Sequence, residues 1–181
     1  DEDGFKAALI KGKGYTKDEA TSAALVAATL QLTAKGIPVI YYGEEIGLTG
    51  LNNYPYQTNR YDFDWSLAND SNKTYSHYKK LLSIRNAYTD VFARGTRNVV
   101  VSSDKDKYDV AAREYQGTKL YVGMNVNTKE LQLPIQVTEG DASVMTDLYS
   151  GKTYVVNGGK VTVTIPSAAD GGTVILKRTG S

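Results

Sequence analysis

Gly36-Ile37-Pro38-Val39-Ile40-Tyr41-Tyr42-Gly43-Glu44-Glu45 is the stretch that decides the expected fold. Its β-branched and aromatic residues run without polar alternation, which predicts a strand over 37–42 that is buried on both faces, as in a parallel sheet. The strand is expected to end at Gly43, beside two carboxylates. Acidic residues at the carboxyl end of a parallel strand are typical of the mouth of an α/β barrel, where such barrels carry their chemistry.

The residues before this stretch predict a helix over 17–35. Thr16 is followed three residues later by Glu19, which is the pattern of a capping box. Gly36 is a natural helix end, and Pro38 cannot continue a helix. Small and apolar residues then recur at helical spacing, which predicts close packing against a sheet; they are Ala20, Ala23, Ala24, Ala27, Leu30 and Ala34.

A long polar loop, 47–72, and a second helix over Thr74–Tyr88 follow. The second half of the chain consists of short apolar runs between turn signals, which is typical of an antiparallel β-sandwich. The eight expected strands are Arg97–Ser102, Asp109–Tyr115, Lys119–Val126, Leu131–Val137, Ser143–Asp147, Thr153–Val156, Lys160–Ile165 and Thr173–Lys177.

Composition excludes several classes of partner. The 181 residues carry a net charge of +1 without a charge block, so neither nucleic acid nor a membrane surface is expected as a partner. The apolar runs are much shorter than the roughly 20 residues that span a bilayer. The chain has no cysteine and one histidine, which leaves no zinc site and no disulfide.

The opening stretch resembles a motif of the α-amylase family of glycoside hydrolases at the last barrel strand, Gly-x-Pro-x-Ile-Tyr-x-Gly-x-Glu. Four further segments resemble the same family, in the family's order. They are Asp1-Glu2-Asp3-Gly4-Phe5 after the seventh barrel strand, 59–65 in the loop after the last strand, 78–88 in the final helix, and Asp147-Leu148-Tyr149-Ser150-Gly151-Lys152 in the sandwich.

This resemblance implies the last βα units of a (β/α)₈ TIM barrel at 1–92, followed by an antiparallel β-sandwich domain at 93–181. The implied activity is that of a retaining glycoside hydrolase that cleaves α-glucosidic bonds in starch-like α-glucans. The nucleophile and the acid/base of the family come from earlier barrel strands, so we expect a C-terminal fragment that is inactive alone. The expected partners are an α-glucan oligosaccharide or polysaccharide and the missing N-terminal part of the barrel.

By its position in the resembling motif, Asp1 is the candidate catalytic residue: the acid that stabilises the transition state through hydrogen bonds to sugar hydroxyls. The alternative is a solvated terminal carboxylate. Glu2 and Asp3 are candidate substrate-binding residues, or surface charges of a βα loop. Glu45 is expected to be a structural acid that pairs with a basic residue. Tyr41 and Tyr42 are expected in the core, with one hydroxyl reaching the pocket as the alternative.

In the long loop, Arg60 is a candidate substrate-binding residue, because its planar fork of donors suits sugar hydroxyls or a carboxylate. A surface salt bridge to Asp62 or Asp64 is the alternative. Tyr54 and Tyr56 are candidates to stack on pyranose faces, ahead of Trp65, although such aromatic residues also serve to pack a loop down.

Metal and proton chemistry receive little support from the sequence. His77 is expected to be solvated on the second helix. Asp104, Asp106 and Asp109 are spaced like part of a calcium loop but lack its glycine and its closing acid, so they read as a charged loop. We therefore expect no cofactor in this segment, and any calcium of the intact enzyme elsewhere. A secreted or cell-surface location is favoured over a cytoplasmic one.

Two rival functions stay open. The sandwich can be a non-catalytic carbohydrate-binding module, although its tyrosines are scattered over strands and turns. It can also be a structural domain that stabilises the barrel.

Overall fold

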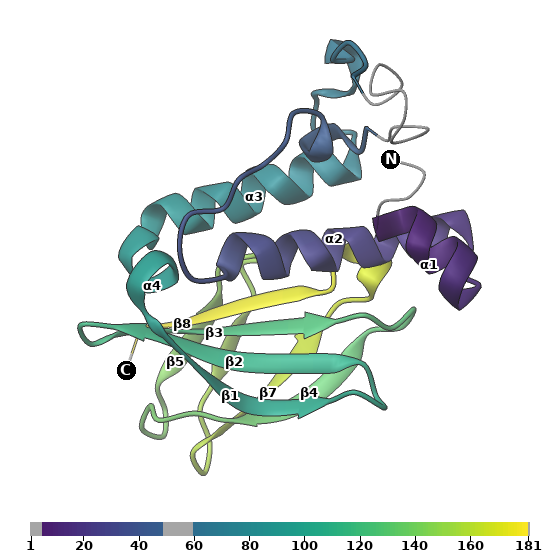
Figure 1. The fold of residues 1–181 in the computed structure, drawn as a ribbon. Coiled ribbons are helices and arrows are strands. Elements are labelled where there is room, and N and C mark those ends of the chain that lie inside the picture. The colour runs from purple at the N-terminus through teal and green to yellow at the C-terminus, as the bar shows by residue number, and fades with distance from the viewer. Residues whose placement is uncertain (1–4, 49–59, 181) are drawn as a thin grey trace.

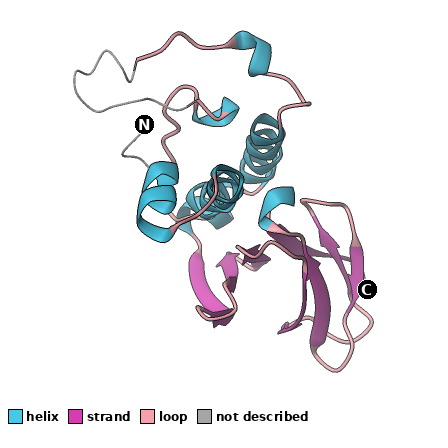
Figure 2. Ribbon diagram, turned by 90° about the vertical axis from the view of Figure 1, so that its right-hand side faces the viewer, coloured by secondary structure: helices cyan, strands magenta, loops and turns pink. Residues whose placement is uncertain are grey.

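The computed structural model describes residues 5–48 and 60–180 as three layers: helices, a large sheet and a small sheet (Figure 1). The helices are α1 (Phe5–Lys13), α2 (Lys17–Thr33), α3 (Lys73–Ala87) and α4 (Thr89–Arg94), with short 3₁₀ turns η1 (Glu44–Ile46), η3 (Trp65–Leu67) and η4 (Ala168–Asp170). The views in Figures 1 and 2 place the helices together on one side of the sheets.

All eight strands predicted from the sequence are confirmed, with small shifts at their ends. They are β1 (Thr96–Ser103), β2 (Tyr108–Tyr115), β3 (Thr118–Asn125), β4 (Leu131–Gln136), β5 (Val144–Asp147), β6 (Thr153–Val155), β7 (Lys160–Ile165) and β8 (Thr173–Gly180). Every pairing is antiparallel. The large sheet has the order β1-β2-β3-β8-β5-β6, and β4 pairs with β7 in the small one.

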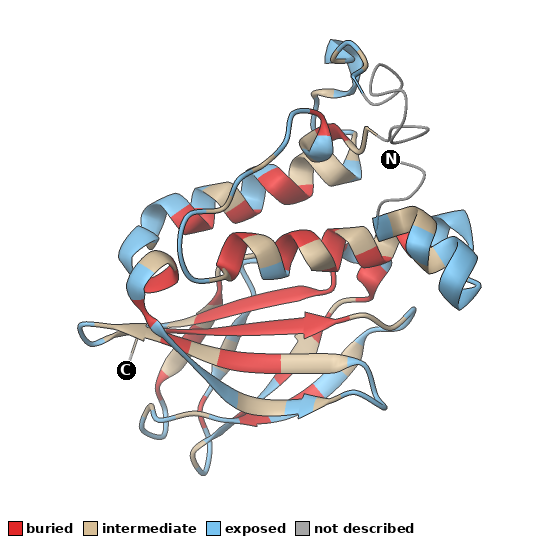
Figure 3. Cartoon of the chain, viewed as in Figure 1, coloured by how far each residue is buried: buried red, intermediate tan, exposed pale blue. Residues whose placement is uncertain are grey.

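Strands β3 and β8 are buried on both faces because they lie at the centre of this arrangement (Figure 3). Side chains alternate between the two faces of a strand. Tyr121 and Leu176 therefore belong to the core between the two sheets, whereas Val122 and Ile175 belong to the core beneath the helices. That second core also contains Leu32 of α2, Leu81 of α3 and Phe92 of α4, so the helices and the sheet share one hydrophobic cluster.

The predicted helices are confirmed with corrected ends. The capping box is present: Glu19 N–H donates to the Thr16 hydroxyl at 3.2 Å, and Thr16 N–H donates to the Glu19 carboxylate at 2.8 Å. Helix α2 ends at Thr33, before the predicted end at residue 35. Helices α1 and α4 were not predicted. The division into domains at residues 92 and 93 stays a prediction.

The predicted buried strand over 37–42 is wrong for this chain. The structure has no strand there, and the side chains of Ile37 and Val39 are 90% and 78% exposed. The predicted core positions of Tyr41 and Tyr42 are wrong as well, since both are exposed. A parallel strand needs neighbouring strands to accept its backbone hydrogen bonds. Among the described residues, none runs beside this segment, and the Gln31 side chain instead donates to Val39 O at 2.8 Å.

The small and apolar residues predicted to pack α2 against a sheet only partly coincide with the residues that do so. Of the predicted residues, Ala20 and Ala23 are buried, whereas Leu30 is exposed. Ala28 and Leu32, which the prediction did not include, are buried as well. Helix α2 thus has two apolar faces, of which the large sheet covers one.

Candidate functional site

The expected mouth of the barrel is the tight turn at Gly43–Gly47. Gly43 has φ 90°, and a Cβ atom there would come within 2.8 Å of Leu48 side-chain atoms, so only glycine fits without strain. The Gly43 N–H donates to Glu45 Oε2 at 2.8 Å. Asn72 Nδ2 donates to Ile46 O at 3.0 Å, which ties the turn to the start of α3.

The role of Glu45 as a structural acid stays a prediction, and its observed partner differs from the expected basic residue. The carboxylate accepts a hydrogen bond from the backbone of its own turn. No described basic side chain forms an ion pair with it.

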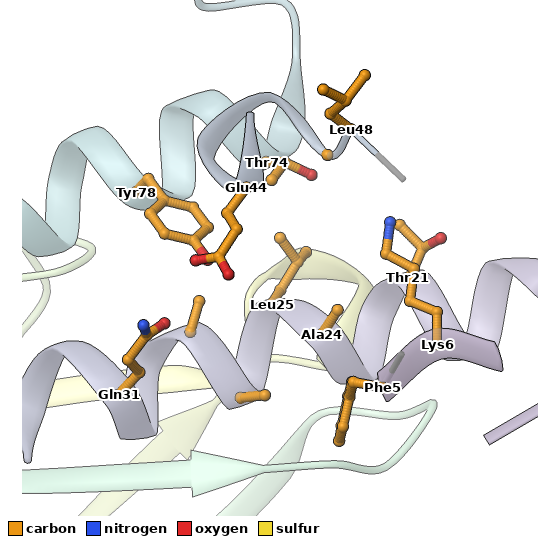
Figure 4. A pocket seen from close by; sticks show the side chains of 13 residues that line it. Phe5, Lys6, Thr21, Ala24, Leu25, Gln31, Glu44, Leu48, Thr74 and Tyr78 are labelled. Carbon is orange, nitrogen blue, oxygen red and sulfur yellow. The ribbon is translucent and has the colours of Figure 1, made fainter. Parts of the chain in front are cut away.

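A pocket of about 260 Å³ opens between α1, α2, η1 and the first turns of α3 (Figure 4). Alanines and Leu25 of α2 form an apolar floor. Polar groups enter it from Lys6, Gln31, Glu44, Thr74 and Tyr78. Among the described residues that line the pocket, Glu44 is the only acid. A retaining glycosidase needs two carboxylates about 5–5.5 Å apart, so this pocket does not hold that pair.

Burial changes the proton affinity of three groups that line the pocket. Glu44 is exposed as a residue, but its carboxyl end turns toward Tyr78 and Gln31, and this partial burial raises its pKa (Figure 4). Burial, together with the charges of Glu44 and Glu45, raises the pKa of Tyr78 to about 12. Burial lowers the pKa of the Lys6 ammonium. Each shift favours the neutral form, as expected where water is partly excluded.

Exposed aromatic residues precede this turn and occur in the described part of the long loop. The rings of Tyr41 and Tyr42 are 4.8 Å apart, and the Tyr42 hydroxyl donates to Tyr61 O at 3.1 Å. Trp65 is 77% exposed, with its ring centroid 4.5 Å from that of Phe63. The described part of the loop therefore presents flat apolar surfaces to solvent.

Most of the predicted site residues lie outside the described residues. They are Asp1, Glu2, Asp3, Tyr54 and Tyr56. Arg60 is described and exposed. The alternative salt bridge is absent among the described residues: Arg60 pairs with neither Asp62 nor Asp64, and the Asp64 carboxylate instead accepts from Ser66 N–H at 3.0 Å. The substrate-binding assignments stay predictions.

His77 is not solvated, contrary to the prediction. Only 2% of it is exposed, because α3 lies against α2 and the turn that contains Tyr149. Its Nδ1 lies 2.6 Å from the Tyr149 hydroxyl, and its Nε2 lies 2.7 Å from Leu25 O. Burial lowers the pKa of His77 to about 4. Neighbours of His77 in the sequence are polar, so only the tertiary contacts reveal its burial.

The described residues contain no cluster of three His, Cys, Asp or Glu side chains that could hold a metal ion. Two of the three acids that resemble a calcium loop have protein partners. Asp106 accepts from the Ser103 hydroxyl at 2.9 Å, and Asp109 pairs with Arg97. Within the same ranges, no helix has the length and the apolar character needed to cross a bilayer.

The sequence matches no protein-family model. It is 31% identical over 180 residues to an amylopullulanase of Thermoanaerobacter thermohydrosulfuricus, a match that covers 91% of this chain and 11% of the relative. It is 25% identical over 136 residues to a cyclomaltodextrinase of Geobacillus thermopakistaniensis, with 75% of this chain and 22% of the relative covered. The chain thus spans less than a quarter of the length of these relatives.

A solved structure has the same fold. The α-amylase of Geobacillus thermoleovorans, determined in complex with acarbose, superposes with a TM-score of 0.75 at 17% identity, over 97% of this chain and 36% of that one. The expected combination of a C-terminal barrel part and a sandwich is confirmed by this similarity. The chain belongs to the α-amylase family of glycoside hydrolases and corresponds to its C-terminal region.

Proposed function

We propose that this chain is the C-terminal part of a retaining enzyme that hydrolyses α-glucosidic bonds in starch-like α-glucans. The observation that carries the proposal is the similarity to an amylopullulanase over 91% of the chain. In the proposed enzyme the nucleophile and the acid/base lie on other barrel strands, and Asp1 stabilises the transition state. Glu2, Asp3, Tyr54, Tyr56 and Arg60 border the sugar. The proposed location is outside the cell or at its surface.

The exposed apolar residues support a partner that completes the barrel. Ile37 and Val39 are among the most exposed apolar side chains of the described chain, and Leu30 on the uncovered face of α2 is also exposed. Soluble proteins commonly expose apolar patches where a partner binds, and we assign these side chains to such an interface. Parallel strands of an N-terminal barrel segment would cover these side chains and pair with the backbone of 37–42, beside which no described strand runs.

The proposed role of the sandwich is to stabilise the barrel. The hydrophobic core beneath the helices contains residues of β3 and β8 together with residues of α2, α3 and α4. Removing the sheet would therefore expose the inner faces of all three helices. A carbohydrate-binding module would need no such shared core, so this observation favours the structural role.

An assay on starch and on pullulan tests the proposal. The purified chain is expected to release no reducing sugar, because a pocket with one described carboxylate cannot carry out double displacement. Turnover by the chain alone would overturn the proposed division of the catalytic residues.

A chimera with a relative provides a second test. A chimera in which this chain replaces the matching region of the cyclomaltodextrinase relative is expected to hydrolyse maltodextrins. The same chimera with Val39→Asp is expected to lose activity, because a charge would enter the proposed interface between strands. The matched control is Val155→Asp, at a valine that is 63% exposed on β6. Equal activity of the two variants would argue against the proposed docking of 37–42.

A further inference from the structure

Two buried arginines hold the C-terminal end of α2, and they come from different layers of the molecule. Arg85 lies on α3 and Arg113 on β2, and the exposed fraction of each is below 10%. Both guanidinium carbons lie 5.9 Å from the centroid of the Phe92 ring, which is fully buried. Neither arginine forms an ion pair with a described carboxylate.

Backbone carbonyl oxygens take the place of an acidic partner. Arg85 donates to Leu32 O at 2.6 Å, to Ala34 O at 3.2 Å, and to Gly36 O. Arg113 donates to Thr33 O and, at 2.7–3.3 Å, to four carbonyls of α4 and the start of β1: Val91, Phe92, Gly95 and Thr96. Arginine suits this arrangement because its planar group offers five donors in a rigid fork.

The contacts replace the usual cap of a helix. The last carbonyls of a helix have no partner within it, and the helix dipole places partial negative charge on them. A glycine in the left-handed region commonly satisfies them. Here the residue after α2, Ala34, is extended (φ −70°, ψ 161°), and Leu32 O and Thr33 O each accept from one arginine instead.

The same contacts fix where the chain goes after α2. Gly36 O accepts from Arg85, while Gly36 N–H donates to Ala93 O at 3.0 Å. Residues 32–36 are therefore attached to α3, α4 and β2 at once. Figure 1 shows α2 ending beside α4, after which the chain crosses α3 toward η1.

We propose that Arg85 and Arg113 are positioning residues that fix segment 36–42 relative to the sandwich and to α3. By holding this segment, they also fix the position of the Gly43–Gly47 turn that follows it. Without the arginines, the carbonyls at the end of α2 would lose their donors. Segment 36–42 would then keep bonds such as that of Gly36 N–H to Ala93 O and that of Gln31 to Val39 O, which hold it less firmly. This positioning role involves only residues of this chain and does not depend on the proposed function. It can fail while the proposed glucan hydrolysis stands, and it can hold if that function is wrong.

Distances between spin labels on the whole 181-residue chain test the proposal. The chain has no native cysteine, so two introduced cysteines can be labelled without background. Val39→Cys reports on the segment, and Gln132→Cys, exposed on β4, provides a fixed point on the small sheet. A second pair, Ser83→Cys with Gln132→Cys, reports on α3, where position 83 is exposed.

The expected result is a change confined to the segment. Arg113→Met and Arg85→Met should broaden the 39–132 distance distribution by about twofold and leave the 83–132 distribution unchanged. Arg113→Lys should broaden it too, because an ammonium has three donors and cannot span the carbonyls on both sides. Arg94→Met is the matched control, an exposed arginine on α4, and should change neither distribution.

Two outcomes would overturn the proposal. One is an unchanged 39–132 distribution in both methionine variants. The other is equal broadening of the two distributions, which would indicate general loosening of the helices. If Arg113→Met fails to fold, as judged by circular dichroism, then Arg113→Lys and Arg85→Met are judged by the same criterion.

Discussion

The Tyr149 hydroxyl and Nδ1 of His77, 2.6 Å apart, form a partly buried hydrogen bond that joins the sandwich to helix α3. The other ring nitrogen, Nε2, lies 2.7 Å from Leu25 O, which can only accept. Nε2 must therefore carry the proton of the neutral ring, and Nδ1 accepts from Tyr149. Thr29 Oγ1 extends the network, at 3.1 Å from Nε2 and 2.7 Å from Thr173 Oγ1.

Removing the Tyr149 hydroxyl should destabilise the fold. Tyr149→Phe leaves a buried acceptor, His77 Nδ1, without its donor, and the expected cost is about 1–3 kcal/mol. Urea unfolding followed by circular dichroism measures the change. Tyr42→Phe, which removes an exposed hydroxyl, is the control and should cost much less. Equal costs would show that the hydroxyl of Tyr149 contributes nothing specific.

The stability of the chain should fall in mild acid because of His77. The folded state holds the pKa of His77 at about 4, against an ordinary value of 6.5. Between these values the unfolded chain binds a proton that the folded chain does not. Stability is therefore fully present above pH 6.5 and decreases as the pH falls to about 4, with a slope approaching about 1.4 kcal/mol per pH unit.

Comparison with the His77→Gln variant separates the pH dependence of stability that His77 causes from the pH dependence that the carboxylates cause. Lys80 disfavours the charged ring as well, and Lys73, Asp70 and Asp170 line the same hollow. These groups stay in both proteins. The difference between the two unfolding free energies should shrink as the pH falls from 6.5 to 4. A constant difference would contradict the assigned protonation state.

The fold should depend on the carboxylate of Asp147 for its stability. It is buried, and its two oxygens accept from the N–H groups of Tyr149, Ser150 and Ile175 and from the Ser150 hydroxyl. Asp147→Asn places amide hydrogens against backbone donors and should cost about 1–3 kcal/mol. Asp104→Asn, at an exposed position, is the matched control in urea unfolding. An unaffected Asp147→Asn variant would contradict the described geometry.

Gly171 should not tolerate a side chain. Its φ is 99°, and a Cβ atom there would collide with the Tyr149 hydroxyl and come within 3.1 Å of His77 Nδ1. Gly117→Ala has a similar φ of 79° but meets no atom within 4 Å, so it measures the backbone strain alone. In thermal unfolding, Gly171→Ala should be the more destabilised variant. In a Tyr149→Phe background, Gly171→Ala should destabilise the chain less, because the hydroxyl with which its Cβ atom collides is absent.

Val39 should contribute nothing to the stability of the isolated chain. Because the side chain is exposed and no described strand runs beside the segment, Val39→Ser should change the unfolding free energy by less than about 0.5 kcal/mol. Val163→Ser, in the core between the sheets, provides the contrast and should be strongly destabilising. A large loss for Val39→Ser in urea unfolding would show that 37–42 packs in this chain after all.

Local patterns account for most of the elements that could be predicted. The capping box at Thr16, the glycine turns and the alternation of apolar residues predict helices α2 and α3 and all eight strands, because each depends on neighbours within a few residues. Motif similarity predicts the candidate residues Asp1, Glu2, Asp3, Tyr54 and Tyr56, which lie outside the described residues and stay predictions.

The failures share a cause. Val39 has the side chain of a buried strand, but burial requires a partner strand that no local pattern supplies. His77 has polar neighbours in the sequence, and its partner Leu25 O lies 52 residues away. Arg113, about which the sequence made no prediction, is likewise buried against a distant partner, Thr33 O, 80 residues away. Burial of such groups is favourable only where distant carbonyls and hydroxyls replace water.

The amino-acid sequence by itself thus determined helices α2 and α3, the eight strands of the sandwich and the family, since backbone preference, side-chain period and motif order are local properties. Only the tertiary structure decided which polar side chains are buried and which apolar segment is exposed. Those outcomes depend on whether a partner from elsewhere in the chain meets each group. For His77, Arg85 and Arg113 the fold supplies that partner, and for segment 37–42 the described residues do not.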